Sequence, residues 1–531
     1  MSSSAGAEAS AAASLHRRRF LEGLAGVAGL AAVATLPADR AAASPRLDSD
    51  SYPFSLGVAS GDPLPDGVVL WTRLAPEPFQ RAGGMPDTEV GVDWVLAADP
   101  DLRFEVRSGR ALAMPELAHS VHVELDGLEP DREYYYRFRY RGDVSPVGRT
   151  RTAPAPGATL RRLDFAFVSC QAWQDGFYSA YRHLAKEDLD LVVHLGDYIY
   201  EGDIGRNGGN RDVRVPRSAR PAPRTLRQWR TRYALYKTDQ DLQRAHARFP
   251  FVVTWDDHEV QNDYAEDESV TGDLSALRTA AYQAYYEHQP LRATSIPYRE
   301  HMRLYRRLTY GDLARFHVLD GRQYRDKPPC GWGEARACEA AYDPDISMLG
   351  GRQERWLYDG LADSSARWDV LANNVMMARL DHDGRRGQRL WHDAWDGFPE
   401  ARNRVTRNFV RSHVRNPVII TGDWHSTFVN DIKKNFDRPE SPTVATEFVG
   451  TSISTNGDVP VYGPYYGPMI KFNPHIKFFD GDRRGYVRCS ITPDEWRTDF
   501  RMVRSVLRRD APVYNFASFV VEDGRPGAQR A

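Results

Sequence analysis

Residues that can bind metal ions follow directly after five short apolar segments of the sequence. The segments span residues 163–168, 191–195, 251–255, 368–371 and 418–421, and the polar residues behind them are Cys170, Asp197, Tyr200, Asp257, His258, Asn373, Asn374, Asp423 and His425. Open α/β sheets carry their binding sites at the carboxyl ends of parallel strands. We therefore expect one site, assembled from the ends of five strands.

The expected ligands are thiol, phenol, imidazole and carboxylate groups, which together suit two cations about 3.5–4 Å apart. Asp197 is the expected bridging carboxylate, because Gly196 before it lets the chain turn sharply beside a metal. Tyr200 would supply a phenolate, which favours a ferric ion, and Cys170 would give a thiolate to the same ion. Two such cations neutralise a phosphate ester and lower the pKa of bound water from about 15.7 to about 7. The trapped hydroxide can then attack phosphorus in line, so the ligand set predicts phosphate ester hydrolysis.

The elements that position these residues fall into two parts of the chain. Between residues 160 and 531, apolar strand-like runs alternate with longer segments that predict helices, which indicates an α/β catalytic domain. Residues 52–155 are rich in turns, and apolar side chains recur at every second position in 121–125 and 134–140, as in β-strands. The spacing of Leu128, Pro130 and Tyr134 ahead of the last of these strands is similar to the tyrosine corner of an immunoglobulin or fibronectin-III sandwich. We expect an all-β domain there, closed by the Pro/Gly-rich linker 152–157.

Composition excludes several classes of protein. The chain has 531 residues, of which 41% are apolar and 27% charged, which is typical of a globular protein with more than one domain. Its formal charge of -2 gives no overall basic field for nucleic acid or anionic lipid. Four cysteines are too few for a disulfide scaffold. The sequence also lacks the GxSxG, HExxH and Walker motifs.

The first 43 residues predict a signal peptide. Arg17, Arg18 and Arg19 precede a Gly/Ala-rich apolar run that is short for a membrane span, and small residues follow at 41–43. The alternative is a single membrane anchor. The core Arg17-Arg18-x-Phe20-Leu21 resembles a twin-arginine signal. That resemblance implies the twin-arginine translocase as a partner and a secreted, extracellular or periplasmic location.

Three motifs resemble those of the calcineurin-like metallophosphoesterases. They are Gly196-Asp197-x-x-Tyr200, Asp257-His258-Glu259 and Gly422-Asp423-Trp424-His425. Together with Ser169-Cys170-Gln171 and the segment 319–325, they are similar to the PhoD-type alkaline phosphatases and phosphodiesterases, a group that includes phospholipase D-type members. The resemblance implies a four-layer αββα catalytic sandwich after the β-domain.

The same resemblance implies cofactors and residue roles. It implies one Fe³⁺ held by Cys170, Asp197, Tyr200 and His425, and one or two Ca²⁺ near Asp197, Asp257, Asp423 and Asn373 or Asn374. His258 would donate to the leaving oxygen or stabilise the transition state beside Asp257, and Arg322 would clamp a phosphate oxygen. Each residue also has a structural explanation. Cys170 and Tyr200 could pack in the core, Asp197 could cap a helix, His258 and His425 could be structural histidines, and Arg322 could form a surface ion pair.

These inferences predict an exported, metal-dependent hydrolase of phosphate esters, with a preference for diesters. The substrate could be a small molecule, a lipid or a polymer, and phospholipase D activity on lipid head groups is the alternative. A non-catalytic surface-binding protein is a second alternative, although the complete ligand set argues against it. We expect a monomer without a nucleic-acid patch or a stable membrane span.

The remaining cysteines and histidines are expected to be structural. Cys330 and Cys338 lie close together in a Gly/Pro-rich loop, where they could form a disulfide or stay free, and we favour the disulfide slightly. Cys489 is expected in the core. The histidines that we expect to be structural are His183, His194, His317 and His382.

Overall fold

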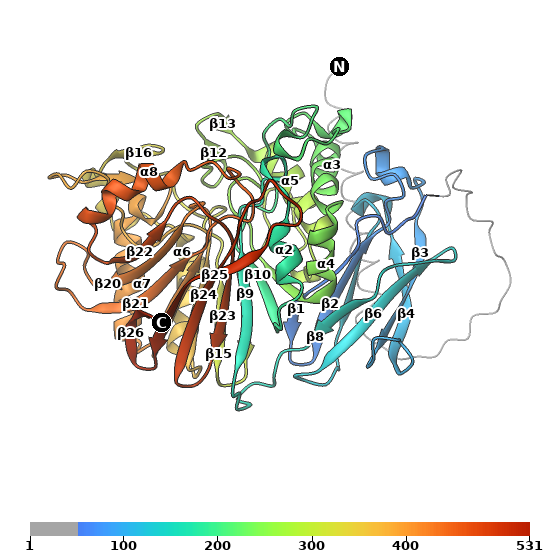
Figure 1. Cartoon of the computed structure of the whole chain (residues 1–531), viewed down its shortest axis with the longest axis horizontal. Coiled ribbons are helices and arrows are strands. Elements are labelled where there is room, and N and C mark those ends of the chain that lie inside the picture. Colours follow the sequence, from blue (N-terminus) through green and yellow to red (C-terminus); the bar gives the residue numbers. More distant parts are fainter. Residues whose placement is uncertain (1–50) are drawn as a thin grey trace, which may run out of the picture.

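The computed structural model describes residues 51–531, and the predicted signal peptide lies outside the described residues. Two large sheets face each other at the centre of the molecule (Figure 1). The first has ten strands in the spatial order β26 (Arg525–Arg530), β25 (Val513–Glu522), β24 (Glu495–Val503), β23 (Arg484–Ile491), β9 (Leu163–Val168), β10 (Leu191–His194), β11 (Pro250–Val253), β1 (Val58–Leu64), β2 (Gly67–Arg73) and β5 (Ser120–Leu125).

The second large sheet has seven strands. Their order is β14 (Arg306–Tyr310), β15 (Ala314–Val318), β17 (Trp368–Asn373), β19 (Pro417–Thr421), β21 (Thr443–Val449), β20 (Thr427–Lys433) and β22 (Ile476–Asp480). Neighbours β9, β10 and β11 run parallel in the first sheet, as do β15, β17, β19 and β21 in the second. The carboxyl ends of these parallel strands therefore meet at one edge of the sandwich.

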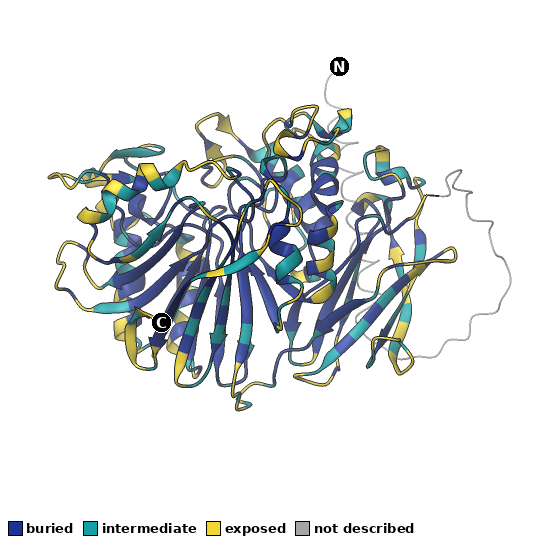
Figure 2. Cartoon of the chain, viewed as in Figure 1, coloured by how far each residue is buried: buried dark blue, intermediate teal, exposed yellow. Residues whose placement is uncertain are grey.

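Alternation along the strands builds three buried layers between four layers of structure. In β9, Phe165 and Phe167 pack between the two sheets, whereas Ala166 and Val168 face the helices on the outer side. Those helices are α2 (Ser179–Leu184), α3 (Leu226–Lys237), α4 (Gln240–Arg248) and α5 (Ser275–His288). Helices α6 (Gly350–Ala362) and α7 (Pro399–Arg411) pack on the outer face of the second sheet. The result is the predicted αββα order, with buried residues concentrated in the central strands (Figure 2).

The N-terminal module packs its own β-sheet against strands that extend the first large sheet. The separate sheet contains β4 (Glu105–Ala113), β3 (Val90–Ala97), β6 (Glu133–Tyr140), β7 (Asp143–Val144) and β8 (Gly148–Arg151). Its buried side chains, among them Tyr134, Tyr136 and Phe138, pack against β1, β2 and β5. Tyr134 accepts a hydrogen bond at its hydroxyl from the Glu129 amide (3.0 Å).

Strand β1 joins the module to the catalytic sheet. It pairs in parallel with β11, with Ser60 opposite Pro250 and Gly61 opposite Phe251. A Cβ atom on Gly61 would lie 2.6 Å from the Phe251 carbonyl oxygen, so this close pairing requires glycine. Strands of the N-terminal module therefore continue the catalytic sheet at one of its edges.

Shorter elements complete the described chain. They are the two-stranded pairs β12 (Glu268–Ser269) with β13 (Gly272–Asp273) and β16 (Glu334–Arg336) with β18 (Arg389–Trp391), and the helix α8 (Tyr462–Tyr466). Cys330 and Cys338 form a disulfide beside β16, as favoured from the sequence, and Cys489 is buried in β23. A search of the helices within residues 51–531 found none with the length and apolar character needed to cross a membrane.

Candidate metal centre

The strand ends bring the expected ligands into one connected cluster. Ligand atoms of Cys170, Asp197 and His425 lie within 4.8 Å of one another, and the same holds for Asp197, Asp257 and His258. A third group with this spacing joins Asp257 and Asp423 to Asp256, which had not been expected as a ligand. Asp197 belongs to two of these groups and Asp257 to two, so the three groups form one continuous site.

The backbone at the site adopts a conformation that non-glycine residues seldom take. The φ angles are +57° at Cys170, +55° at Asp197, +64° at Asp423 and +50° at His425. Such left-handed residues cost free energy and are held by their surroundings, and they cluster at functional sites. Each of these residues lies in a turn directly behind a parallel strand, where the turn directs the side chain toward the shared edge.

Gly196 makes one of these turns. Its φ angle is +108°, and a Cβ atom there would lie 2.4 Å from the Asp256 Cβ atom and 2.5 Å from the Asp256 nitrogen. The absence of a side chain lets the turn behind β10 approach the turn behind β11. Glu259 then ties the two turns together, because its carboxylate accepts from the amides of Asp197 (3.1 Å), Tyr198 (2.5 Å) and Asp256 (2.9 Å).

Tyr200 joins the thiol-containing part of the cluster. Its hydroxyl donates to Asp197 Oδ2 (2.7 Å) and lies 3.0 Å from His425 Nε2. The Thr455 hydroxyl donates to the same phenol oxygen (3.0 Å). On its other side, the His425 ring contacts the Tyr462 hydroxyl through Nδ1 (3.2 Å). Phenol, thiol, imidazole and carboxylate groups therefore converge as the sequence predicts.

Burial makes the acidic groups of the site hard to ionise together. The pKa values of the Cys170 thiol and the Tyr200 phenol are raised by burial and by the nearby Asp197 carboxylate. The pKa of Asp423 is raised because burial, together with Asp257 and other carboxylates, outweighs the Arg322 charge. Burial and Asp197 raise the pKa of Glu259 to about 8. Groups with this arrangement are stabilised in their ionised form by bound cations.

Unpartnered oxygen atoms test whether metals fit this site. Within the described residues, Asp197 Oδ1, Asp257 Oδ1 and Asp256 Oδ2 are buried and make no hydrogen bond. Buried carboxylate oxygens without a donor are expensive unless a cation binds them. The residues present therefore fit a metal centre, with sulfur, phenol and imidazole donors at one end and carboxylates at the other.

Arg322 lies among the carboxylates. Its side chain is fully buried, and it donates to Asp256 Oδ1 (2.5 Å) and to both oxygens of Asp393 (2.8 Å each). Its second terminal nitrogen lies 3.6 Å from Asp257 and 4.0 Å from Asp423. Burial would raise the pKa of Asp257, but the Arg322 and His258 charges outweigh it and the pKa is lowered. The positive charge of Arg322 thus partly balances four carboxylates. This buried environment differs from the surface ion pair that the sequence left open.

His258 lies at the less buried side of the cluster. Its Nδ1 atom is 2.7 Å from Glu201 Oε2, and its ring lies 4.2 Å from the Tyr200 ring, measured between centroids. Burial lowers the pKa of His258, but Glu201 and Asp257 raise it more, so the imidazole is held protonated well above its usual range. Glu201 in turn accepts from the Asn262 amide (2.9 Å).

Asn373 and Asn374 have structural partners. The Asn373 amide donates to the Val375 carbonyl and accepts from Trp395 Nε1 (3.3 Å). Asn374 donates to the Trp255 carbonyl and accepts from the Gly321 amide (2.8 Å). The structure therefore places the polar atoms of both side chains in contacts that hold loops around the site.

Two family models match this chain. The model described as "PhoD-like phosphatase" matches residues 165–500, and the one described as "PhoD-like phosphatase, N-terminal domain" matches residues 40–154. The chain belongs to the PhoD-like phosphatase family. This membership confirms the predicted class of enzyme, a phosphoric ester hydrolase.

Two of the following three matches cover most of the chain and agree with that assignment. Alkaline phosphatase D of Bacillus subtilis (strain 168) is 45% identical over 526 residues, which cover 97% of this chain and 89% of that protein. The solved structure titled "Structure of PhoD" superposes with a TM-score of 0.87 at 45% identity, covering 92% of this chain and 93% of that chain. Purple acid phosphatase 23 of Arabidopsis thaliana is 32% identical over 93 residues, 17% of this chain and 20% of that protein. The match to the solved structure confirms the predicted fold class.

Sequence reasoning missed several residues of this PhoD-like phosphatase site. Asp256 and Glu259 flank the expected pair Asp257 and His258, and Glu201 follows Tyr200. Their position next to a motif residue is the sequence feature that could have identified them. Asp393 carried no such signal, because it follows the short strand β18 and no long apolar run. It also holds Arg325 (2.5 Å), which makes it the carboxylate shared by two buried arginines.

Proposed function

We propose that this PhoD-like phosphatase is an exported, metal-dependent hydrolase that prefers phosphate diesters. The observation that carries the proposal is the single connected cluster of Cys170, Asp197, Tyr200, Asp257, Asp423 and His425 at the ends of parallel strands. Its relative in Bacillus subtilis is named an alkaline phosphatase, which supports ester hydrolysis by this chain. Export by the twin-arginine translocase rests on the sequence of residues 1–43.

The donor types support two kinds of cation. Thiolate, phenolate and imidazole donors from Cys170, Tyr200 and His425 suit Fe³⁺, with Asp197 shared between the two positions. The carboxylates of Asp257 and Asp423 offer hard oxygen donors, which suit Ca²⁺. Such cations, when bound, neutralise the charge of a phosphate ester and lower the pKa of a bound water molecule.

The protein's own side chains have separate roles in this proposal. His258 donates a proton from Nε2 to the oxygen of the leaving group, while Glu201 orients the ring through Nδ1 and keeps it protonated. Arg322 is a positioning residue, because its bonds to Asp256 and Asp393 hold the carboxylates near Asp257 and Asp423. This positioning role is proposed beside the phosphate clamp that the resemblance implies, since the Arg322 side chain is fully buried among those carboxylates.

One observation favours the alternative of an amphiphilic phospholipid substrate. The segment that carries Tyr462, a contact of His425, also exposes the apolar side chains Val459, Val461, Tyr465 and Phe472. Exposed apolar side chains gathered beside a site suit a ligand with an apolar part. Comparing hydrolysis of a phosphatidylcholine emulsion with that of a water-soluble diester distinguishes the two substrate classes.

The decisive test measures release of p-nitrophenol from bis-p-nitrophenyl phosphate by the mature protein. Exhaustive chelation should abolish turnover, and Fe³⁺ and Ca²⁺ returned together should restore it. His258→Asn should lower kcat by about 10²–10⁴-fold with metal content unchanged, while His301→Asn, an exposed histidine, should leave kcat within twofold. Turnover that survives complete metal removal would contradict the proposal.

A further inference from the structure

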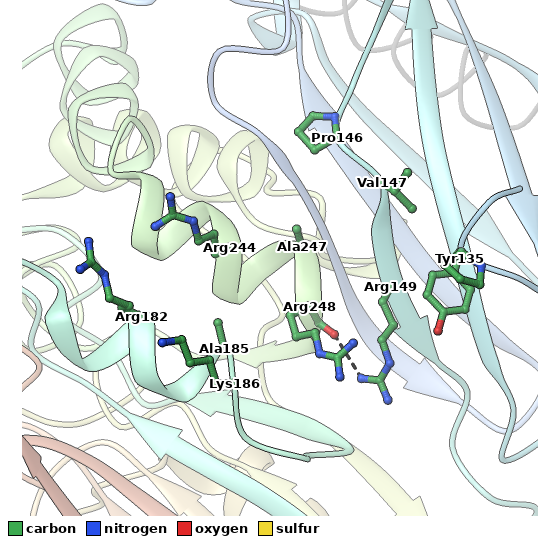
Figure 3. Close-up of a pocket in the computed structure, with 11 residues that line it drawn as sticks. Tyr135, Pro146, Val147, Arg149, Arg182, Ala185, Lys186, Arg244, Ala247 and Arg248 are labelled. Atoms are coloured by element: carbon green, nitrogen blue, oxygen red, sulfur yellow. Dashed lines mark hydrogen bonds between the residues drawn. The ribbon is translucent and has the colours of Figure 1, made fainter. Parts of the chain in front are cut away.

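A basic groove lies between the N-terminal module and helices α2 and α4 (Figure 3). Its volume is about 770 Å³. The two helices form one wall, and β6, β8 and the loop with Pro146 form the other. The five charged side chains that line it are Arg149, Arg182, Lys186, Arg244 and Arg248. No carboxylate is among the described residues of its lining.

The carboxylates nearby do not neutralise these cations. Arg182 and Arg244 share one partner, Asp241, at 3.3 Å and 2.5 Å. Arg149 pairs with Glu133 and also donates to the Arg248 carbonyl (3.2 Å). Lys186 and Arg248 are exposed and form no ion pair within residues 51–531. Five positive charges therefore face the paired carboxylates Asp241 and Glu133 and the more distant Asp510, which leaves a positive surplus at the groove.

The ends of helices α2 and α4 explain only part of this accumulation of positive charge. Cations in the last turn of a helix interact favourably with its dipole, and α2 and α4 both end at the groove. Arg149 comes from a β-strand, however, and its guanidinium points at the end of α4. Two helix ends and a strand from the other module thus bring like charges together, an arrangement that a bound anion stabilises.

The groove is separate from the metal centre. Helices α2 and α4 precede the amino ends of β10 and β11; Lys186 lies in the connection behind α2, and Arg248 is the last residue of α4. The metal ligands Asp197 and Asp257 follow the opposite, carboxyl ends of the same two strands. An anion in the groove therefore occupies a second site.

We propose that this groove binds a phosphate-bearing polyanionic chain. Arginine is suited to phosphate because its planar group offers two parallel donors. Five cations spread over one groove exceed what a single phosphate can contact, which favours several linked phosphates. The groove is a cleft between two modules, so it fits a flexible chain better than the flat surface of a bilayer. Binding here does not require the proposed hydrolysis.

The test uses inorganic polyphosphate as the probe and the metal-loaded full-length mature protein. Affinity is measured by calorimetry for the wild type and for the double variant Lys186→Gln/Arg248→Gln. We expect at least a fivefold loss of affinity in the variant and a steep weakening of wild-type binding with added salt. The matched control is Arg355→Gln/Arg411→Gln, which removes two exposed helical arginines on α6 and α7 and should change affinity less than twofold.

Three results would overturn the proposal. They are no binding of polyphosphate at low salt, an equal loss in the control variant, or binding to anionic phospholipid vesicles without binding to polyphosphate. Hydrolysis of bis-p-nitrophenyl phosphate is measured in parallel and should be the same for all variants. A loss of polyphosphate binding in the groove can therefore be distinguished from a loss of the proposed catalytic activity. Thermal unfolding of each variant shows that the fold is retained.

Discussion

At the scale of single residues, Arg322 has the most demanding environment in the site. It is fully buried, and its three nitrogens face Asp256, Asp393, Asp257 and Asp423 at once. A guanidinium can serve several carboxylates because its five donors lie in a fixed plane. An ammonium group has no such fork, so a lysine at this position keeps the charge but cannot keep all of these contacts.

Arg322→Lys should therefore lower both stability and metal retention. We expect the free energy of unfolding to fall by about 2–3 kcal/mol, because at least one buried carboxylate loses its partner. Metal content after gel filtration should fall as well, since Asp257 and Asp423 are no longer held in place. Guanidinium denaturation and elemental analysis measure the two effects.

A second buried pair provides the control for this prediction. Arg402 bonds Asp396 (2.5 Å) on the side of the molecule covered by α7, with no contact to the metal cluster among the described residues. Arg402→Lys should cost a similar amount of stability and leave the metal content intact. Loss of metal from this control, or full retention in Arg322→Lys, would contradict a positioning role for Arg322.

At the scale of elements, the turns behind the strands determine the site. Gly196 and Gly142 both have positive φ angles, +108° and +93°. They differ in their surroundings, because a Cβ atom on Gly142 would meet nothing within 4 Å, whereas one on Gly196 would collide with Asp256. Alanine at Gly142 would therefore introduce backbone strain alone, whereas alanine at Gly196 would introduce the same strain together with a steric clash.

Gly142→Ala should lower the free energy of unfolding by about 1 kcal/mol, because it introduces backbone strain and no clash. Gly196→Ala should cost about 3 kcal/mol or more, because overpacking against the next turn is added to that strain. It should also reduce hydrolysis, since Asp197 and Asp256 must shift apart. Chemical denaturation and the p-nitrophenol assay measure these effects. Equal destabilisation by the two substitutions would show that the close approach of the turns is unimportant.

The sequence predicts elements where the signal is local. The short apolar runs and the polar residues behind each of them were sufficient to expect the strands and most of the clustered ligands. Asp393 could not be predicted because its role depends on a contact with Arg322 across a long stretch of chain. The pairing of β1 with β11 is likewise non-local, so nothing in either strand indicates that the modules share a sheet. The signal peptide, the metal identities and the monomeric state stay predictions.

At the scale of the whole molecule, the two modules are joined by buried polar contacts as well as by the shared sheet. Trp71 Nε1 donates to the Glu287 carbonyl (3.1 Å), and Arg73 contacts His288 Nε2 (2.7 Å). Arg306 pairs with Asp62 (2.6 Å). Contacts of this kind are costly to separate, because each leaves a buried group without a partner. We therefore expect the described chain to unfold as one cooperative unit.

Lys237 lies in this junction without a carboxylate partner among residues 51–531. Its ammonium is 4.3 Å from the centre of the Trp71 ring and 5.2 Å from that of Tyr198. Burial lowers the pKa of Lys237 to about 7. An unfolded lysine titrates at about 10.4, so between pH 7 and 10 the unfolded chain binds more protons than the folded one. Stability should therefore rise with pH across this window, and the full penalty applies below pH 7.

Lys237→Met should remove that penalty and stabilise the whole molecule. The expected gain is on the order of 3 kcal/mol at pH 6, and it should shrink toward zero as the pH approaches 10. Lys327→Met, which removes an exposed lysine paired with Glu268, should change stability by less than about 1 kcal/mol with no such trend. Guanidinium denaturation of the three proteins from pH 6 to pH 10 measures the difference. A gain that is independent of pH would mean that Lys237 is charged in the folded state throughout this range, stabilised there by the two aromatic rings.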